Sequence, residues 1–297
     1  MYRFLCVLLS AGLLISLSLI AEPSFAIIQS PREYERIICA APSVTEMVFS
    51  LGLGDRVVGV SHFTVYPPAA QDKKSIGGLI NPSKERIIAL NPDLVLTQGK
   101  HERLAELCRT QNIKFVSVKI EEIKDIHKAI LELGILLNAQ KKAQRLSQKI
   151  KKDLSALTAK IQNIPPKKVF LCLSHTPGDL TGLMTTGQGT FLHEIIEMSG
   201  GINIFSDIKE RYPRVSKESL IMRHPDIIIE VYAKGLNLNQ QEMLLKDWDR
   251  LSILPAVGNS RIHFLTEDYL LIPGVRVNLI LKKFIQTLHP EVELEND

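Results

Sequence analysis

The sequence predicts an α/β fold of two lobes, Rossmann-like and each built on a parallel β-sheet, with a single long helix joining them. Three observations lead to this prediction. Short apolar runs alternate with amphipathic stretches, a helix-forming segment lies near the middle of the chain, and one fourteen-residue pattern occurs twice. Continuous Val/Ile/Leu runs separated by segments of helical period are typical of strands buried on both faces of a parallel sheet.

The first 26 residues are typical of a secretory leader. Arg3 precedes an apolar run from Phe4 to Ala21, and small residues at Ser24 and Ala26 form a signal-peptidase pattern. An uncleaved membrane anchor is the alternative, because the run approaches the length of a bilayer span. We therefore expect a secreted protein, periplasmic if the cell has two membranes, with residues 1–26 as its signal peptide.

The charge of the chain is mild and its cysteines are few. The formal net charge is +4, and no block of basic residues is present, so nothing indicates nucleic acid as a partner. Three cysteines follow the leader, an odd number without metal-ligand spacing. We expect them to be buried thiols: Cys39, Cys108 and Cys172.

Residues 27–122 are predicted to form the N-terminal lobe. Apolar runs at 36–40, 56–60, 93–96 and 114–118 have the length and composition of buried strands, and amphipathic stretches lie between them. This alternation is that of an α/β lobe in which helices cover a parallel sheet.

The connecting segment, residues 123–163, is predicted to be helical. It contains no proline, and apolar residues recur every three or four positions over 139–162. A helix of that span would be roughly 36 Å long at ~1.5 Å per residue. Pro165 and Pro166 then end it.

Residues 164–297 are predicted to form the C-terminal lobe. Strand-like runs recur at 167–173, 226–230 and 261–265, and a last helix is expected near 277–288. The stretch TTGQGTF (185–191) predicts a turn that leads into a helix at Thr190.

The duplicated pattern reads SKERIIALNPDLVL at 83–96 and SKESLIMRHPDIII at 216–229, with six identical positions. In both copies a Ser can cap a helix and a Glu stands in the first turn, where the helix dipole favours an anion. A Pro then ends the helix and an apolar strand follows. Each lobe thus contains the same helix–turn–strand unit, and Glu85 and Glu218 occupy matched positions.

Residues that follow the predicted strands suggest a binding site and no catalytic one. The motifs of serine hydrolases, P-loop NTPases and zinc proteases are absent, so we do not expect an enzyme. His62, His175 and Asp268 stand at strand ends and would suit zinc or manganese as an alternative. Aromatic and apolar residues at the same ends suit a large flat ligand instead: Phe63, Tyr66, Leu79 and Tyr269.

Five stretches, in the same order along the chain, carry a family resemblance that spans the mature protein. They are RIICAAPSVTEMVFSLGLGDRVVGVSHFTVYPP, IGGLINPSKERIIALNPDLVL, TFLHEIIEMSGGINIF, VSKESLIMRHPDIII and YLLIPGVRV. The chain resembles the helical-backbone (class III) periplasmic substrate-binding proteins of ABC importers for iron complexes, haem and cobalamin, and the cobalamin-binding members most. The resemblance implies a ligand held between the lobes, a stiff connector and no covalently bound cofactor. It also implies a monomer that docks through Glu85 and Glu218 onto arginines of a dimeric permease, which works with its ATPase.

The resemblance also implies which residues line the cleft. Phe63 stands where the cobalamin-binding pattern has Tyr, while Leu79 and Gln98 stand where it has Trp. Asp268 matches an acidic ligand contact, and Arg276 is the candidate for the nearby basic one. A corrinoid, a ferric siderophore and haem remain open as ligands, with haem less favoured because no Tyr stands out as an axial ligand. The full set of expected ligand contacts is Phe63, Tyr66, Leu79, Gln98, His175, Asp268, Tyr269 and Arg276.

Overall fold

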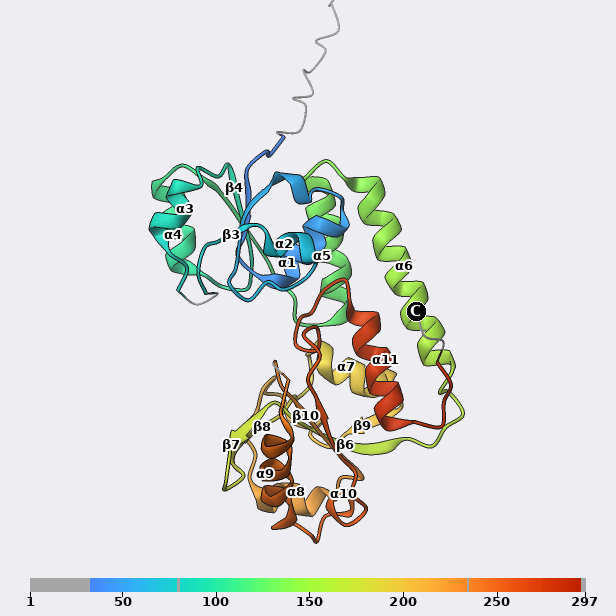
Figure 1. The fold of residues 1–297 in the computed structure, drawn as a ribbon. Helices are drawn as coiled ribbons and strands as arrows, with labels where there is room; N and C mark the ends of the chain where they lie inside the picture. Colours follow the sequence, from blue (N-terminus) through green and yellow to red (C-terminus); the bar gives the residue numbers. More distant parts are fainter. Residues whose placement is uncertain (1–32, 79–80, 234, 295–297) are drawn as a thin grey trace, which may run out of the picture. The chain divides into compact units, whose positions relative to one another are not determined.

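Hydrophobic runs of strand length build one parallel sheet in each half of the chain (Figure 1). The computed structural model describes residues 33–78, 81–233 and 235–294, so the predicted leader and Leu79 lie outside the described residues. Within these ranges no helix has the length and apolarity needed to cross a membrane.

The sheet of the N-terminal lobe has five parallel strands in the order β3-β2-β1-β4-β5. Four helices and one 3-10 turn connect them: α1 (Pro42–Ser50), the turn Gly54–Arg56, α2 (Pro68–Gln71), α3 (Lys84–Ala89) and α4 (Glu102–Thr110). The strands are β1 (Ile37–Cys39), β2 (Val57–Val60), β3 (Lys74–Ser75), β4 (Leu94–Gln98) and β5 (Lys114–Val118).

The sheet of the C-terminal lobe has four parallel strands in the order β11-β10-β6-β9. They are β6 (Lys167–Cys172), β9 (Gly201–Asn203), β10 (Ile227–Val231) and β11 (Ile262–Leu265). An antiparallel pair that the sequence did not predict, β7 (Ser174–Thr176) and β8 (Thr181–Met184), follows β6. The helices are α7 (Phe191–Met198), α8 (Lys217–Arg223), α9 (Leu238–Asp249), α10 (Pro255–Gly258) and α11 (Val277–Leu288).

The central strands of both sheets are buried on both faces, as their continuous apolar sequences predicted. In β1, Ile37 and Cys39 face one apolar cluster while Ile38 faces another. The first cluster also contains Ile227 and Ile229 of β10, together with residues of α1, α5, α6, α7 and α11. The inner faces of the two sheets therefore belong to one continuous core. The prediction of two α/β lobes with parallel sheets is confirmed.

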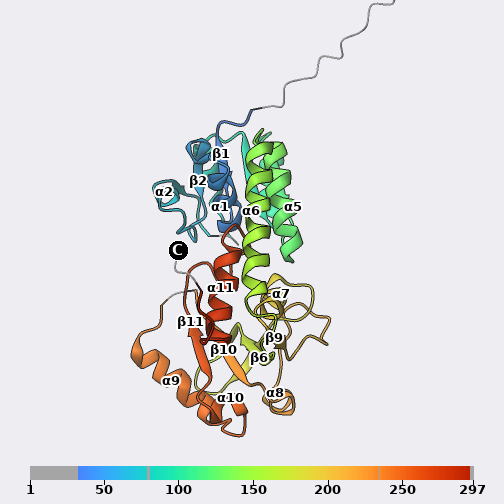
Figure 2. The same ribbon diagram turned by 90° about the vertical axis from the view of Figure 1, so that its right-hand side faces the viewer.

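The connecting segment is two helices, α5 (Ile123–Leu136) and α6 (Gln140–Ala159). The chain turns between them at Asn138, whose φ of 59° lies in the left-handed region. Helix α6 runs beside α5 and then beside α11 of the C-terminal lobe (Figures 1 and 2). At twenty residues it is about 30 Å long. Helix α6 therefore ends three residues before the predicted end at 162, and the turn at Asn138 divides the predicted segment 123–163 into two helices.

The duplicated pattern folds the same way in both lobes. Ser83 and Ser216 cap α3 and α8, each accepting a hydrogen bond of 3.2 Å from a backbone N–H three residues on. Before each Pro the chain takes a left-handed conformation, with φ of 45° at Asn91 and 49° at His224. After each Pro an Asp accepts a backbone N–H at the start of the neighbouring strand: Asp93 from Arg36 at 3.1 Å, and Asp226 from Lys168 at 2.8 Å. The strands that follow, β4 and β10, pair with the first strand of their own sheets, β1 and β6.

The three cysteines are free, buried thiols, as predicted. Burial raises the pKa of Cys39 to about 12 and that of Cys108 to about 11. Neither thiol is therefore a nucleophile at neutral pH.

Candidate ligand-binding cleft

A cavity of about 520 Å³ opens at the carboxyl ends of β1 and β4. The order of the N-terminal sheet reverses between these two strands, and open α/β sheets bind ligands at such switch points. Both lobes contribute walls. The N-terminal lobe provides Ala41, Pro42, Ser43, Phe63, Gln98, Gly99, Lys119, Ile120 and Glu121, and the C-terminal lobe provides Phe191, Tyr212, Leu271, Ile272 and Pro273.

Two polar side chains of this cavity, Ser43 and Gln98, are held in place by hydrogen bonds. The hydroxyl of Ser43 donates to Gln98 Oε1 at 2.5 Å, and Gln98 Nε2 donates to the carbonyl of Ile120 at 3.4 Å. Phe63 is 59% exposed, so a ligand over its ring would remove a large apolar area from water. Of the predicted ligand contacts, the structure brings Phe63 and Gln98 into this cavity.

Arg276 lies in a different place from the one expected of a basic ligand contact. It is only 7% exposed, and it donates to both carboxylate oxygens of Glu46, from Nη2 at 2.6 Å and from Nε at 3.1 Å. Its Nη1 donates to Asp268 at 2.8 Å. Because Glu46 belongs to α1 and Arg276 immediately precedes α11, this ion pair joins the two lobes.

The remaining predicted contacts of this region surround Arg276. The guanidinium carbon lies 4.2 Å from the ring centre of Tyr66 and 5.4 Å from that of Tyr269. Tyr66, Asp268 and Tyr269 are not among the residues that line the 520 Å³ cavity. The structure thus gathers them around an interlobe arginine and does not place them on the wall of that cavity.

Further bonds join the lobes behind the cavity. The backbone N–H of Phe191 donates to the carbonyl of Glu121 at 2.6 Å. Glu194 of α7 accepts the backbone N–H of Ile123 at 2.5 Å, so a carboxylate of one lobe satisfies the first turn of a helix that packs on the other. Burial raises the pKa of Glu194, although this N–H opposes the rise.

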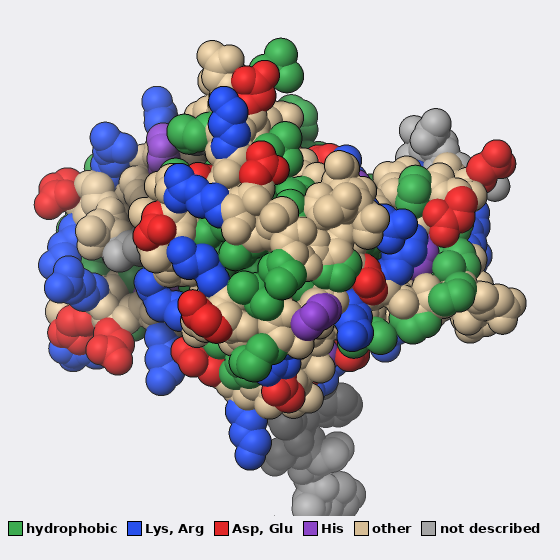
Figure 3. All heavy atoms as spheres, turned by 90° about the horizontal axis from the view of Figure 1, so that it is seen from below, with side chains coloured by type: hydrophobic (Ala, Val, Ile, Leu, Met, Phe, Trp, Pro, Cys, Tyr) green, Lys and Arg blue, Asp and Glu red, His purple; other side chains and the backbone are tan. Residues whose placement is uncertain are grey.

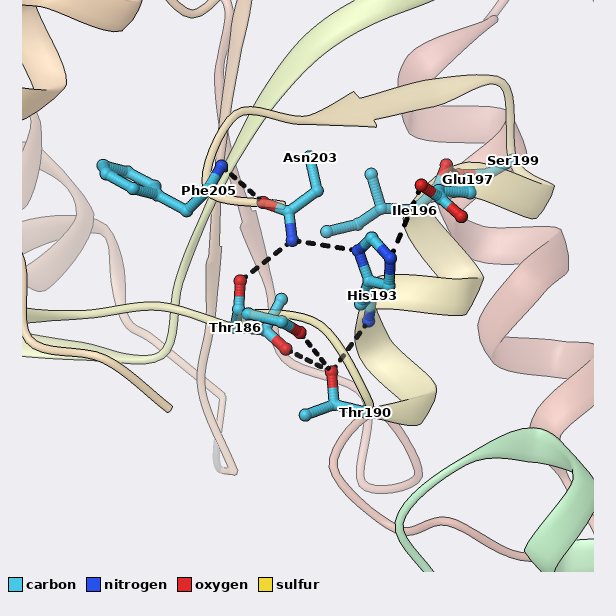
Figure 4. Close-up of polar contacts among 9 residues, drawn as sticks. Thr186, Thr190, His193, Ile196, Glu197, Ser199, Asn203 and Phe205 are labelled. Carbon is cyan, nitrogen blue, oxygen red and sulfur yellow. Dashed lines mark hydrogen bonds and ion pairs between the residues drawn. The ribbon is translucent and has the colours of Figure 1, made fainter. Parts of the chain in front are cut away.

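The loop 185–190 is fixed by the polar network shown in Figure 4, and the predicted turn and helix start are confirmed. The Thr190 hydroxyl accepts the N–H of His193 at 3.1 Å. Asn203 on β9 donates to the carbonyl of Thr186 at 2.9 Å and to His193 Nδ1 at 3.2 Å, and it accepts the N–H of Phe205 at 3.1 Å. Since Nδ1 of His193 accepts, its proton is on Nε2, which lies 3.5 Å from Glu197.

This fixed loop carries Gln188 and Gly189 into a wider, more open cavity of about 900 Å³. The wider cavity shares Glu121 and Tyr212 with the first one. Across it, Arg211 of the C-terminal lobe lies 3.5 Å from Glu121 of the N-terminal lobe. The two cavities therefore form one cleft along the interlobe boundary.

His175 lies in a separate cavity of the C-terminal lobe. Its Nε2 is 3.3 Å from Glu230, and its side chain is only 2% exposed. Burial alone would lower the pKa of His175, but Glu230, the carbonyl of Thr176 and Asp247 together outweigh this effect, and the pKa is raised.

The alternative metal site is not assembled. His62 is exposed and packs edge-on against Phe63, His175 is buried beside Glu230, and Asp268 is paired with Arg276. Throughout residues 33–78, 81–233 and 235–294, no three His, Cys, Asp or Glu side chains are arranged to hold a metal ion.

The predicted docking carboxylates have matched surroundings on α3 and α8. Glu85 and Glu218 are exposed in the first helical turn, and each pKa is lowered by the backbone N–H of the residue itself and by the hydroxyl of the capping Ser. On the face of the C-terminal lobe seen in Figure 3, acidic and basic side chains are interspersed around exposed apolar ones. Met222 of α8 and Ile253 before α10 are 73% and 70% exposed.

Three carboxylates of functional interest were not predicted from the sequence: the buried Glu46 and Glu230, and the half-buried Glu194. Each lies in a helix or strand whose other residues are largely apolar. From the sequence alone, a Glu at such a position is interpreted as the end of the strand or as the solvent-facing side of the helix. A Glu inside the strand IIIEV was the one visible signal, because a charged side chain in a fully buried strand requires a partner.

Comparisons with known protein families and with individual proteins agree on one family. Residues 37–269 match a family described as periplasmic binding protein. The vitamin B12-binding protein of Salmonella paratyphi A is 32% identical over 224 residues, which are 75% of this chain and 80% of that protein. The vitamin B12-binding protein of Vibrio vulnificus is 29% identical over 273 residues, 91% of this chain and 92% of that protein.

Solved structures agree with this match. The periplasmic vitamin B12-binding protein of Vibrio cholerae superposes with a TM-score of 0.72 at 26% identity, covering 86% of this chain and 96% of that chain. A possible iron-binding periplasmic solute-binding protein of Staphylococcus epidermidis superposes with a TM-score of 0.75 at 28% identity, covering 87% and 100%.

Proposed function

The chain belongs to the periplasmic binding protein family, and from this premise we propose that it is the solute-binding protein of an ABC importer. It captures a metal-chelate nutrient between its lobes and delivers it to a membrane permease and its ATPase. The observation that carries this proposal is the cleft at the switch point of the N-terminal sheet, whose walls come from both lobes. No covalently bound cofactor is needed for capture and delivery.

A corrinoid is the ligand class that we favour. The relatives named above are vitamin B12-binding proteins, and the cleft has apolar walls at Phe63, Phe191 and Leu271 with one fixed amide at Gln98. Walls of this kind suit a large ligand that carries hydrogen-bonding groups at its edge.

A ferric chelate is the second candidate, because one tyrosine does line the cleft. Tyr212 borders both cavities of the cleft, and a phenolate is a known ligand of ferric iron. Burial raises the pKa of Tyr212, however, which disfavours the phenolate. This opposition ranks haem and ferric siderophores below a corrinoid.

Binding to the mature chain (residues 27–297) tests the ligand. Cyanocobalamin, haemin and ferrichrome would each be titrated by calorimetry, and the visible absorption of protein purified from its native host would be recorded. We expect cyanocobalamin to bind most tightly, and Phe63→Ala to weaken it about tenfold, since ring contacts contribute about 0.5–1.5 kcal/mol beyond their area. Failure of all three chelates to bind would overturn the proposal.

Delivery is proposed to use Glu85 and Glu218, one carboxylate on each lobe. The lowered pKa of each keeps it anionic, as a contact with permease arginines requires. The double variant Glu85→Ala, Glu218→Ala is expected to abolish uptake while ligand affinity stays within twofold of the wild type. Glu102→Ala removes another first-turn Glu and is the matched control, expected to leave uptake intact. Uptake that survives in the double variant would reduce both residues to helix-dipole partners.

Export is proposed through the leader 1–26, consistent with the periplasmic character of the family. N-terminal sequencing of the exported chain is expected to find Ile27 first. A chain that begins at Met1 and stays with the membrane fraction would show an anchor instead.

A further inference from the structure

A second cavity, of about 420 Å³, lies at the carboxyl ends of β6 and β10, beside α9. The order of the C-terminal sheet reverses between these two strands, so this cavity is the counterpart of the one between β1 and β4. It meets the interlobe cleft at Leu271, which lines both. Its side walls are mainly apolar: Leu173, Pro177, Val231, Leu236, Met243, Leu244 and Leu271.

Charged and polar side chains form its floor. Glu230 is 1% exposed, and its carboxylate accepts hydrogen bonds from the indole N–H of Trp248 and the hydroxyl of Tyr232. His175 Nε2 lies 3.3 Å from Glu230 Oε1, and its Nδ1 lies 3.2 Å from the carbonyl of Thr176. Because both ring nitrogens face acceptors, the doubly protonated imidazolium is the form that suits these neighbours.

The other ionisable groups around His175 also leave the imidazolium as its favoured form. On β6, burial keeps the Cys172 thiol neutral by raising its pKa. Immediately after β10, burial and Glu230 raise the pKa of Tyr232. From α9, Asp247 contributes a negative charge, and its carboxylate accepts the backbone N–H of Gly178 at 2.7 Å. The imidazolium of His175 therefore compensates Glu230 on the floor of the cavity, whereas Asp247 does not line the cavity and accepts a backbone N–H instead.

We propose that this cavity is a subsite for an uncharged, mainly apolar arm of the ligand held in the interlobe cleft, and that His175 makes its occupation proton-dependent. The inference rests on the proposed function. The apolar walls select the arm, the compensated floor offers no charge to pair with, and the shared wall at Leu271 lets one ligand reach both cavities. Its volume falls in the range of about 300–1,000 Å³ that is usual for small-molecule sites.

The proton dependence has a definite sign. An apolar arm displaces water from above Glu230 and His175, and loss of water disfavours a net charge far more than a compensated pair. Once His175 loses its proton, Glu230 is left uncompensated beneath the arm. Affinity is therefore greatest with His175 charged and falls as the pH rises through its pKa, by at most about tenfold per pH unit because one proton is linked.

Filling the cavity tests the subsite. Met243 lines it and is 48% exposed, whereas Leu245, two residues on, is 40% exposed and does not line it. Met243→Trp is expected to weaken cyanocobalamin at least tenfold in calorimetry, and Leu245→Trp less than twofold. Both positions are exposed enough that either variant should fold, which thermal unfolding checks.

The wild type offers an independent readout, because Trp248 is the only tryptophan of the chain. Its indole N–H gives a single resonance in a ¹⁵N-edited spectrum, next to Glu230 and the cavity. Cyanocobalamin is expected to shift this resonance, and His175→Gln is expected to remove the pH dependence of affinity between pH 6 and 8.

The outcomes separate the two proposals. If the wild type binds cyanocobalamin while Met243→Trp binds equally well and the Trp248 resonance does not move, the subsite is refuted and the proposed function stands. Affinity of the wild type that is flat with pH, or that rises with pH, refutes the role of His175. If neither cyanocobalamin, haemin nor ferrichrome binds, the proposed function fails and the subsite fails with it.

Discussion

Removing one partner of the buried ion pair of Glu46 and Arg276 is expected to destabilise the protein strongly, and Glu46→Gln tests this. The substitution keeps the shape of the side chain and removes its charge. Glu46 is 1% exposed and Arg276 7% exposed, so the remaining guanidinium would be buried with Asp268 as its one carboxylate partner. Breaking a buried pair in this way costs about 3–5 kcal/mol. Because Asp268 still compensates part of the charge, we expect about 3 kcal/mol.

The two partners differ in what burial does to them. Burial raises the pKa of Glu46 although Arg276 opposes it, whereas Glu46 and Asp268 raise the pKa of Arg276 against the effect of its burial. A double variant, Glu46→Leu with Arg276→Met, removes both charges and is expected to recover most of the stability, since buried pairs contribute little relative to well-packed apolar side chains.

Urea denaturation followed by circular dichroism would measure these free energies of unfolding. Glu267→Gln is the control, because it breaks the half-buried pair of Glu267 with Lys283, at 2.6 Å, and should cost less than about 1 kcal/mol. The reasoning is refuted if Glu46→Gln costs no more than this control, or if the double variant is as unstable as the single one.

Three further predictions concern the scaffold. Gly134→Ala should lower the free energy of unfolding by about 1–3 kcal/mol although Ala favours helices, because the new Cβ would overlap that of Ala143. Gly258→Ala is the control, because the new Cβ has room there and stability should not change. Equal melting temperatures of the two variants would contradict close packing at Gly134. Asn203→Ala should lower the free energy of unfolding by about 2 kcal/mol or more in urea denaturation, since it leaves the buried hydrogen-bond partners of Asn203 unpaired. A loss below about 0.5 kcal/mol would show that other contacts hold the loop 185–190. The folded pKa of His175 is raised, so its contribution to stability should be complete below the ordinary His pKa of 6.5 and lost as the pH rises through the folded pKa. His175→Gln should remove this part of the pH dependence of the free energy of unfolding. An unchanged pH dependence in the variant would exclude His175 as the cause.

Local sequence patterns were sufficient for most strands of the two parallel sheets and for the duplication, but not for the short strands β3, β7, β8 and β9. Apolar runs gave strands buried on both faces, and Ser83 and Ser216 gave helix starts, because each signal depends only on residues close in the chain. The α/β lobes and their order followed from these signals together with the family resemblance.

The side chains of the cleft were predicted less well, because their positions depend on partners far away in sequence. Phe63 and Gln98 line the cleft as expected, since strand ends bring them to the switch point. Arg276 was expected at the ligand, but its partner Glu46 lies 230 residues earlier, on a helix of the other lobe. No local pattern connects two such residues, so their pairing could be seen only in the folded chain.

The shared core limits how the cleft can open. One apolar cluster includes the inner faces of both sheets and the helices between them, and Arg276 and Glu194 add polar bonds across the same boundary. Rotating one lobe away from the other would expose part of this core and break a buried ion pair, at a cost of several kcal/mol. We therefore expect the ligand to enter by movement of the loops that border the cleft, which carry Phe63 and Tyr212, while the sheets keep their places. Distances between spin labels on α3 and α8 should then change by less than about 2 Å on binding, as in other pre-organised sites. A larger change would mean that the lobes rotate and that the shared core does not restrain them.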